Sequence, residues 1–183
     1  ESRVLISPIT DEIVRVRLAP DGEFGRDHSW AVVTDESGAR PQWGLEENGD
    51  AIEMVTNTLR LRISRSPCRI SFHHLDGVMI SGDCPTRGMS WAGDEVRCWK
   101  QLGEEDHFFG LGEKGSPMDK RGTALVNWNH DAAEHDPWTD PLYQTHPFAL
   151  VLNNGRAHGI FFDNACRSFF DFGKTSRGSY CFG

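Results

Sequence analysis

The chain has 183 residues and a formal net charge of -8 at neutral pH, and 38% of its residues are hydrophobic. A chain of this length and composition can bury a substantial core. The negative charge, without clustered Lys and Arg, excludes a nucleic-acid surface, because phosphate binding requires a basic patch. No apolar run approaches about 18 residues, so the sequence predicts no membrane-spanning helix.

Apolar and polar residues alternate with a period of two along much of the chain. In the segment that starts at Ile13, Val14 and Val16 face one way, and the arginines that follow each of them face the other. This alternation is typical of a strand with one buried and one wet face. The same reasoning predicts further strands at 51–54, 59–63, 70–73, 78–81, 97–100, 124–128, 148–152, 159–163 and 168–172.

Turn residues separate these segments. Asn154-Gly155 stands between two apolar runs and predicts a tight hairpin, because Asn and Gly tolerate positive φ. Other turn signals occur at 20–22, 47–50 and 75–77. Many short strands without intervening helices predict an all-β fold, an antiparallel β-sandwich. Because no linker or internal repeat interrupts the pattern, we expect a single domain over residues 1–183.

The cysteines bear on the cellular compartment. They number 5, an odd count, and no two of them form a C-x-x-C pair. Free thiols are therefore expected rather than a disulfide framework or a zinc site, because disulfides need paired cysteines. Free thiols favour a reducing compartment, and we predict a cytoplasmic location.

A cluster of histidines and acids runs from His130 to Asp136. Helical zinc motifs need their ligands on one helix face, and the spacing here is one residue too long. Pro137 also opposes a helix. We therefore predict no metal and no other cofactor. A loop that hydrogen-bonds a polar ligand is the favoured interpretation, and a purely solvated loop is the alternative.

Asp131 is the candidate ligand-binding residue of this cluster. A carboxylate near Trp128 combines a bidentate acceptor with an apolar wall, which suits sugar hydroxyls. The alternative interpretation is an Asp that forms a turn with its own backbone. The residues alone favour neither.

Two further patterns lead to no catalytic assignment. Gly110-Leu111-Gly112 lacks phosphate-loop spacing and precedes no predicted helix, so tight turning or close backbone packing explains it better. Glycoside hydrolysis needs two carboxylates on rigid elements. Asp131 and Asp136 lie on one predicted loop, and nothing nearby would raise the pKa of one above the other. We predict no catalytic residue in this chain.

An ordered series of motifs extends through the second half of the chain. It comprises FGLGEK at 109–114, DKRG at 119–122, WNHD at 128–131, DPLY at 140–143, HPF at 146–148, AHGIFFDN at 157–164 and SFFDFG at 168–173. This series resembles the N-terminal β-sandwich domain of family-31 glycoside hydrolases, the α-glucosidase and α-xylosidase family. The resemblance covers roughly residues 95–173, whereas residues 1–94 fit only by strand pattern.

The resemblance implies both a fold and a role. In the family, this domain is a galactose-mutarotase-like supersandwich that precedes a (β/α)₈ barrel, which supplies both catalytic aspartates of a retaining mechanism. We therefore expect a fragment that ends before the last strand of its sandwich, with the barrel as partner and α-linked glucosides as substrates. By the same resemblance, Asp131 of the W-N-x-D motif contacts substrate at the pocket rim, with Trp128 beside it. The loop that carries them narrows the pocket so that only chain ends enter, which implies exo-action.

Three alternatives stay open. A stand-alone carbohydrate-binding module would need an exposed aromatic platform. A mutarotase-like epimerase would need a paired general acid and base. A purely structural domain would differ from the pocket-rim interpretation only in that Asp131 would not contact substrate. The residues predict neither the sugar, nor the linkage, nor whether the protein forms a homo-oligomer.

Overall fold

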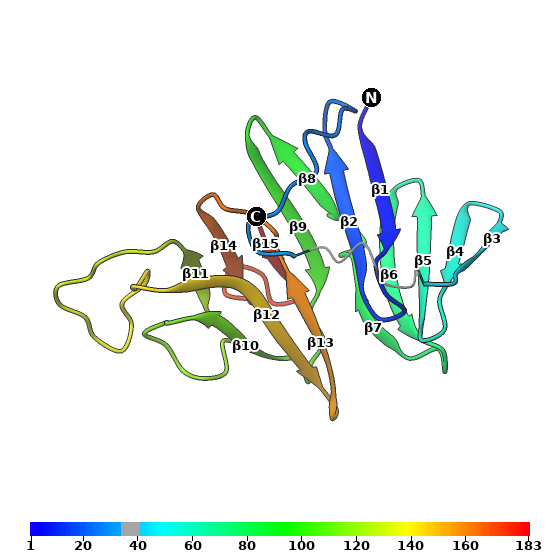
Figure 1. The fold of residues 1–183 in the computed structure, drawn as a ribbon. Coiled ribbons are helices and arrows are strands. Elements are labelled where there is room, and N and C mark those ends of the chain that lie inside the picture. Colours follow the sequence, from blue (N-terminus) through cyan, green and yellow to red (C-terminus); the bar gives the residue numbers. More distant parts are fainter. Residues whose placement is uncertain (34–40) are drawn as a thin grey trace. The chain divides into compact units, whose positions relative to one another are not determined.

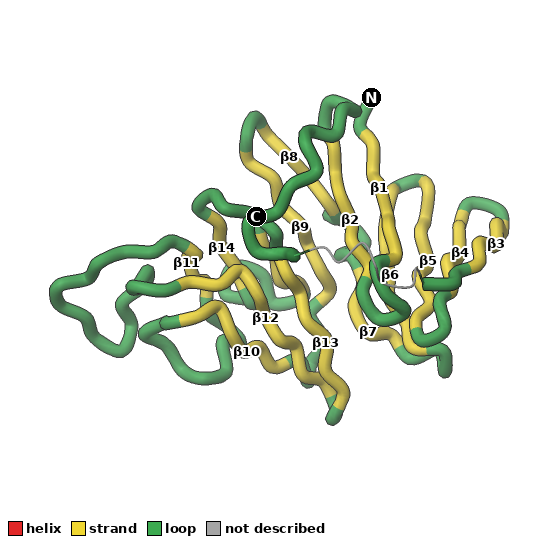
Figure 2. Tube along the Cα trace, in the orientation of Figure 1, coloured by secondary structure: helices red, strands yellow, loops and turns green. Residues whose placement is uncertain are grey.

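The computed structural model describes residues 1–33 and 41–183, and this part of the chain is built from strands. Every strand pair with a defined register is antiparallel. Figure 2 shows strands joined by loops, with no helix among the described residues. The predicted all-β, antiparallel fold is therefore confirmed. Within the described ranges, no helix has the length and apolar character needed to cross a membrane.

The chain divides into two compact units, an N-terminal unit of residues 1–91 and a C-terminal unit of residues 92–183. Strand β8 (Met89–Ala92) lies where the two units meet in sequence. We had expected no internal boundary. The prediction of one domain over the whole chain stays a prediction, and each unit is described by itself.

The N-terminal unit consists of two small sheets. A two-stranded sheet pairs β1 (Arg3–Pro8) with β2 (Val14–Ala19). The second sheet has five strands in sequence order: β3 (Gly44–Asn48), β4 (Ala51–Val55), β5 (Leu59–Arg65), β6 (Cys68–His74) and β7 (Met79–Gly82). Leu61 and Ile70 are buried in its core, and Val14 and Val16 of β2 pack against them. The strand predicted after Ile13 is confirmed as β2, although exposure does not alternate along it, because its arginines are also partly buried.

The C-terminal unit also contains two sheets, whose strands are shown in Figure 1. One runs in the order β11 (Ala124–Asn127), β14 (Ser168–Asp171), β15 (Ser179–Phe182) and β9 (Glu95–Gln101). The other runs in the order β10 (His107–Gly112), β12 (Thr145–Asn153) and β13 (Arg156–Phe161). The terminal strand β15 is paired on both sides, with β14 and with β9.

An aromatic core joins these two sheets into a sandwich. The Phe108 ring of β10 stacks on Phe172, just after β14, with centroids 4.4 Å apart, and Phe170 stacks on Phe182 at 5.2 Å. Stacked and edge-on ring pairs stabilise a core by about 0.5–1.5 kcal/mol beyond burial of their area. The completely or almost completely buried members of this cluster are Phe108, Leu111, Leu125, Ala149, Val151, Phe170, Phe172, Tyr180 and Phe182.

The predicted hairpin is confirmed between β12 and β13. Asn153 pairs with Arg156, and the two residues between them both have positive φ, 48° at Asn154 and 77° at Gly155. Two positive φ values in a two-residue loop match the right-handed twist of the flanking strands. The turn residues therefore set the register of β12 against β13.

The glycines of β10 permit close backbone packing, as predicted. Gly110 and Gly112 have φ values of 107° and 81°, and the strand register shifts between them. A Cβ at Gly110 would lie 2.6 Å from the Phe148 carbonyl oxygen, and a Cβ at Gly112 would lie 2.6 Å from that of Gln144. Only glycine fits both the conformation and the space.

Candidate functional site

The segment 128–144 is a long loop between β11 and β12 that carries both predicted site residues. Figure 1 shows it, in yellow, extending away from the strands of the C-terminal unit. It contains no strand or helix of its own. Loops of this length without secondary structure are uncommon in compact domains and are usually functional or disordered. Its internal contacts decide between these two cases.

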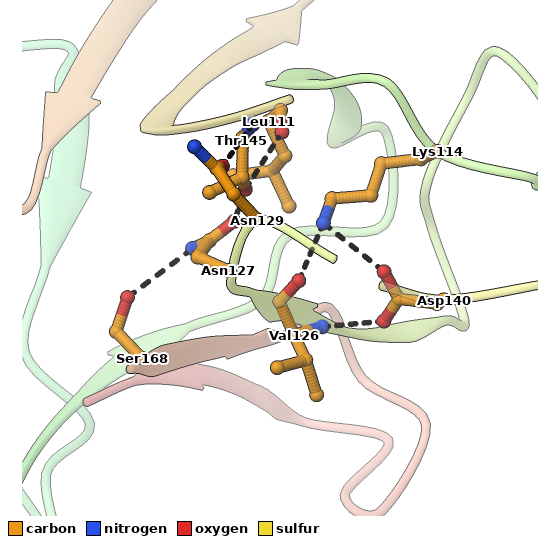
Figure 3. A network of polar contacts seen from close by, with 8 residues as sticks. All are labelled: Leu111, Lys114, Val126, Asn127, Asn129, Asp140, Thr145 and Ser168. Carbon is orange, nitrogen blue, oxygen red and sulfur yellow. Dashed lines mark hydrogen bonds and ion pairs between the residues drawn. The ribbon is translucent and has the colours of Figure 1, made fainter. Parts of the chain in front are cut away.

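A buried ion pair secures the base of the loop. Lys114 Nζ lies 3.0 Å from Asp140 Oδ1, and the Lys114 side chain is 0% exposed. The same ammonium group donates to the Val126 carbonyl oxygen, while Asp140 Oδ2 accepts from the Val126 N–H at 2.5 Å (Figure 3). A buried charge is tolerated when it is paired and fully hydrogen-bonded. Three segments distant in sequence are thus joined at one point.

A second set of hydrogen bonds joins the two ends of the loop. The Thr145 N–H donates to Asn129 Oδ1 at 2.9 Å, and the Thr145 hydroxyl donates to Asn127 Oδ1 at 2.9 Å. Asn127 in turn contacts the Ser168 hydroxyl at 3.4 Å (Figure 3). The side-chain oxygens of Asn127 and Asn129 both accept hydrogen bonds from Thr145, at the opposite end of the loop. The position of Trp128, between these two asparagines, is therefore well defined.

The loop also has a small interior. Ala132 and Leu142 are buried, and the His130 N–H donates to the Leu142 carbonyl at 3.0 Å. The Tyr143 hydroxyl donates to the Ala132 carbonyl oxygen. Loops whose ends are close and whose own side chains fill them are compact and frequently functional. These contacts favour a preformed functional loop over a disordered one.

The structure places the two predicted site residues in different surroundings. Trp128 is 46% exposed and lines a pocket of about 320 Å³. Asp131 is exposed and lines neither this pocket nor the second one described below. The other residues that line the Trp128 pocket are Asn127, Asn129, Thr145, Pro147, Asn164, Ala165, Cys166 and Ser168.

The turn-forming aspartate of the loop is Asp136 rather than Asp131. Asp136 Oδ1 accepts from the Trp138 N–H at 2.8 Å and from the Thr139 hydroxyl at 3.0 Å. The bond from Trp138 and that from Thr139 lower the pKa of Asp136. Within the described part of the chain, no hydrogen bond or ion pair engages the Asp131 carboxylate. Its side chain is therefore available to a ligand.

The histidines and acids of the loop do not converge. His130, Glu134 and His135 are all exposed, and the His135 ring meets Tyr143 edge-on with centroids 6.1 Å apart. Among residues 1–33 and 41–183, no group of three His, Cys, Asp or Glu side chains could hold a metal ion.

A second hydrogen-bonded carboxylate lies on the neighbouring loop that follows β10. Asp119 Oδ1 accepts from the N–H groups of Phe108 and Arg121, both at 3.0 Å, and Oδ2 lies 2.6 Å from His107 Nδ1. Burial alone would raise the pKa of Asp119. The bonds from His107, Phe108 and Arg121 outweigh that effect and hold the pKa below its ordinary value of 3.8.

This lowered pKa predicts an acid-sensitive contribution to stability. Ionised Asp119 stabilises the fold above the unfolded-state pKa of 3.8, and the contribution is lost as the pH falls through the lower folded-state value. Asp119→Asn should therefore destabilise the protein near neutral pH, with a deficit that shrinks below about pH 4. Urea unfolding across this range measures it, with exposed Glu104→Gln as control. A deficit independent of pH would contradict the prediction.

Known proteins match this chain over nearly its whole length. The model of the glycosyl hydrolase 31 N-terminal galactose mutarotase-like domain matches residues 3–171. The chain belongs to this family. The resemblance seen in the motifs from Phe109 to Gly173 is thereby confirmed, and the match extends it to the N-terminal unit.

Two relatives of this family-31 domain show its context. α-Glucosidase 2 of Bacillus thermoamyloliquefaciens is 36% identical over 174 residues, which is 94% of this chain and 22% of that protein. A family-31 dextranase of Flavobacterium johnsoniae, solved with isomaltotriose, superposes with a TM-score of 0.91 at 30% identity, over 99% of this chain and 22% of its own. A family-31 α-xylosidase from Xanthomonas citri, at 21% identity and a TM-score of 0.74, shares the fold.

The family-31 domain therefore spans about a fifth of the length of these relatives. In both relatives the matched region is part of a much larger protein, an α-glucosidase in one case and a dextranase in the other. The Lys114–Asp140 pair that secures the loop was not singled out from the sequence. The available signal was weak: both residues stand in stretches that carry the family resemblance, without any local pattern that pairs them.

Proposed function

We propose that this chain is the N-terminal domain of a retaining, exo-acting α-glycosidase, with the catalytic residues on a (β/α)₈ barrel beyond it. In this proposal, the loop 128–144 forms part of the rim of the substrate pocket. The observation that carries it is the exposed Asp131 carboxylate, which has no partner among residues 1–33 and 41–183 and lies on a loop that is otherwise internally bonded. A free carboxylate on a preformed support suits hydrogen bonding to sugar hydroxyls.

The second part of the proposal concerns Trp128. Its half-exposed indole lines a pocket whose other walls are mainly neutral and polar, including Asn129 and Asn164. Sugar rings present an apolar C–H face and neutral hydroxyls, so an aromatic wall beside amide groups is complementary to them. The likeness to an α-glucosidase and to a dextranase solved with isomaltotriose supports α-linked glucosides as the substrate class.

Asp131→Asn tests the role of the carboxylate. The host is a chimera in which residues 3–171 replace the matching domain of the Bacillus α-glucosidase 2. Hydrogen bonds to a charged group contribute about 1.5–3 kcal/mol, so kcat/KM for an α-glucoside should fall roughly 10- to 150-fold. Glu134→Gln, an exposed acid on the same loop, is the control. Equal activity of the two variants would contradict a substrate contact by Asp131.

The chain alone should hydrolyse nothing, because both carboxylates of a retaining mechanism are proposed to lie on the barrel. The purified chain incubated with 4-nitrophenyl α-glucoside should release no 4-nitrophenol above the rate without protein. Release that survives repurification would overturn the proposed division of labour. The cytoplasmic location stays a prediction.

A further inference from the structure

A second groove, separate from the Trp128 pocket, lies at the base of the loop. Its volume is about 440 Å³, and it shares no lining residue with that pocket. One wall is the segment after β10 and the other is the turn within the loop 128–144. The lining residues are Lys114, Gly115, Ser116, Pro117, Pro137 and Trp138.

Backbone contacts fix the two walls against each other. The Gly115 N–H donates to the Thr139 carbonyl at 3.3 Å. A Cβ at Gly115 would lie 2.8 Å from the carbonyl oxygens of both Asp136 and Thr139, so the walls approach as closely as glycine allows. The Asp136 carboxylate holds the turn at Trp138, and the Lys114–Asp140 pair holds the facing wall. The groove is therefore preformed.

The groove presents an aromatic surface to solvent. Trp138 is 69% exposed, on a turn whose backbone is hydrogen-bonded. Pro117 and Pro137 add apolar faces beside it. Below the surface, the Ser116 hydroxyl is buried without a hydrogen-bond partner in the described part of the chain. Buried polar groups are normally satisfied, and because Ser116 lines the groove, rotation of its side chain would bring this hydroxyl to a ligand there.

The electrostatics select a neutral ligand. Lys114 is the one charged residue among those that line the groove, and Asp140 neutralises it at 3.0 Å. Asp136, whose carboxylate is ionised and turned into its own loop, adjoins the groove. Among the described residues that line the groove, no unpaired cation is present for an anion, so phosphate and acidic peptides are disfavoured. A ligand with an apolar face and uncharged hydroxyls fits the lining.

We propose that this groove is a distal sugar subsite in which the Trp138 indole stacks on one glucosyl ring of an α-linked oligosaccharide. The sugar class rests on the proposed function, whereas the site itself rests on Trp138, Gly115 and Ser116. The subsite extends recognition beyond the ring near Trp128 and so favours longer substrates. A proline-rich peptide is the competing occupant, because such peptides also dock on exposed aromatic side chains.

The test uses the chain itself, followed by NMR during titration with isomaltotriose and, separately, maltotriose. The Trp138 indole N–H and the Gly115 and Ser116 amides should shift in a saturable manner below about 50 mM, since a few contacts support a millimolar Kd. Trp138→Ala should weaken binding about 10-fold, and Trp138→Phe should restore part of it. Exposed Trp30→Ala is the matched control and should leave binding unchanged.

Two outcomes would overturn the proposal. One is no saturable shift at Trp138 and Gly115 with either trisaccharide. The other is a shift of these signals by a proline-rich peptide but not by sugar, which would make the groove a peptide site. Neither outcome bears on Asp131, whose role is read from the activity of the chimera. The two proposals therefore fail independently.

Discussion

Asp140→Ala is expected to lower the free energy of unfolding by about 3–5 kcal/mol, because it leaves a buried ammonium group without its counter-charge. Lys114 is 0% exposed, so water cannot replace the lost carboxylate without structural change. The substitution also removes the acceptor of the Val126 N–H. Urea unfolding, followed by circular dichroism, measures the loss.

A double variant separates charge burial from general damage. In Lys114→Met/Asp140→Asn, the buried charge is gone, and the Asn oxygen can still accept from the Val126 N–H. This variant should be more stable than Asp140→Ala, since replacing both partners of a buried pair is often nearly neutral. If the double variant is less stable than the single one, the buried charge is not the cause of the lost stability.

Because the Lys114–Asp140 pair holds the loop base, Asp140→Ala should also broaden the NMR signals of residues 128–144.

Gly112→Ala is the second change with a large expected effect, a loss of about 2–5 kcal/mol. Part of it, about 1–2 kcal/mol, is the left-handed conformation, since φ is 81° at this position. The rest is steric, because a Cβ would lie 2.6 Å from the Gln144 carbonyl oxygen and 3.0 Å from the Thr145 Cα. The displaced backbone is the end of the loop 128–144, so the loop should move as well.

Gly155→Ala provides the matched control. Its φ of 77° is close to that of Gly112, but nothing lies within 4 Å of a Cβ built there. It should therefore cost only the conformational part, about 1–2 kcal/mol. The difference between the two variants measures the close approach of β10 to β12. Equal losses would show that backbone conformation alone explains the requirement for glycine at position 112.

Alternation identified several strands, and two strands that lack it were missed. The segment at Leu59–Ile63 alternates Leu and Ile with Arg, and it lies within β5. Strand β3 was missed because all five of its residues are exposed, so no buried face imposes a pattern on Glu46 and Glu47. Its pairing with β4 defines it instead. Strand β15 was missed for the opposite reason, since all of its residues are buried.

Part of the candidate site was likewise predictable from the sequence, and part was not. The family motif singled out Trp128 and Asp131 as candidates, and their role stays a prediction. The structure assigns the turn-forming role to Asp136, and Asp131 has no partner in the described chain. The motif did not reveal which residues hold the loop. Lys114 and Asp140 are 26 positions apart, and their pairing requires β10, β11 and the loop to be in place.

Side-chain alternation and turn residues were therefore sufficient to predict an antiparallel all-β chain with a tight hairpin at Asn154-Gly155, because both effects act between near neighbours. The division into two units, the buried charge at Lys114 and the groove beside Trp138 were decided only by tertiary structure. Each of these depends on segments distant in sequence that meet in space. No local pattern records whether Lys114 will be buried, because burial is a property of the packed sheets and the loop around it.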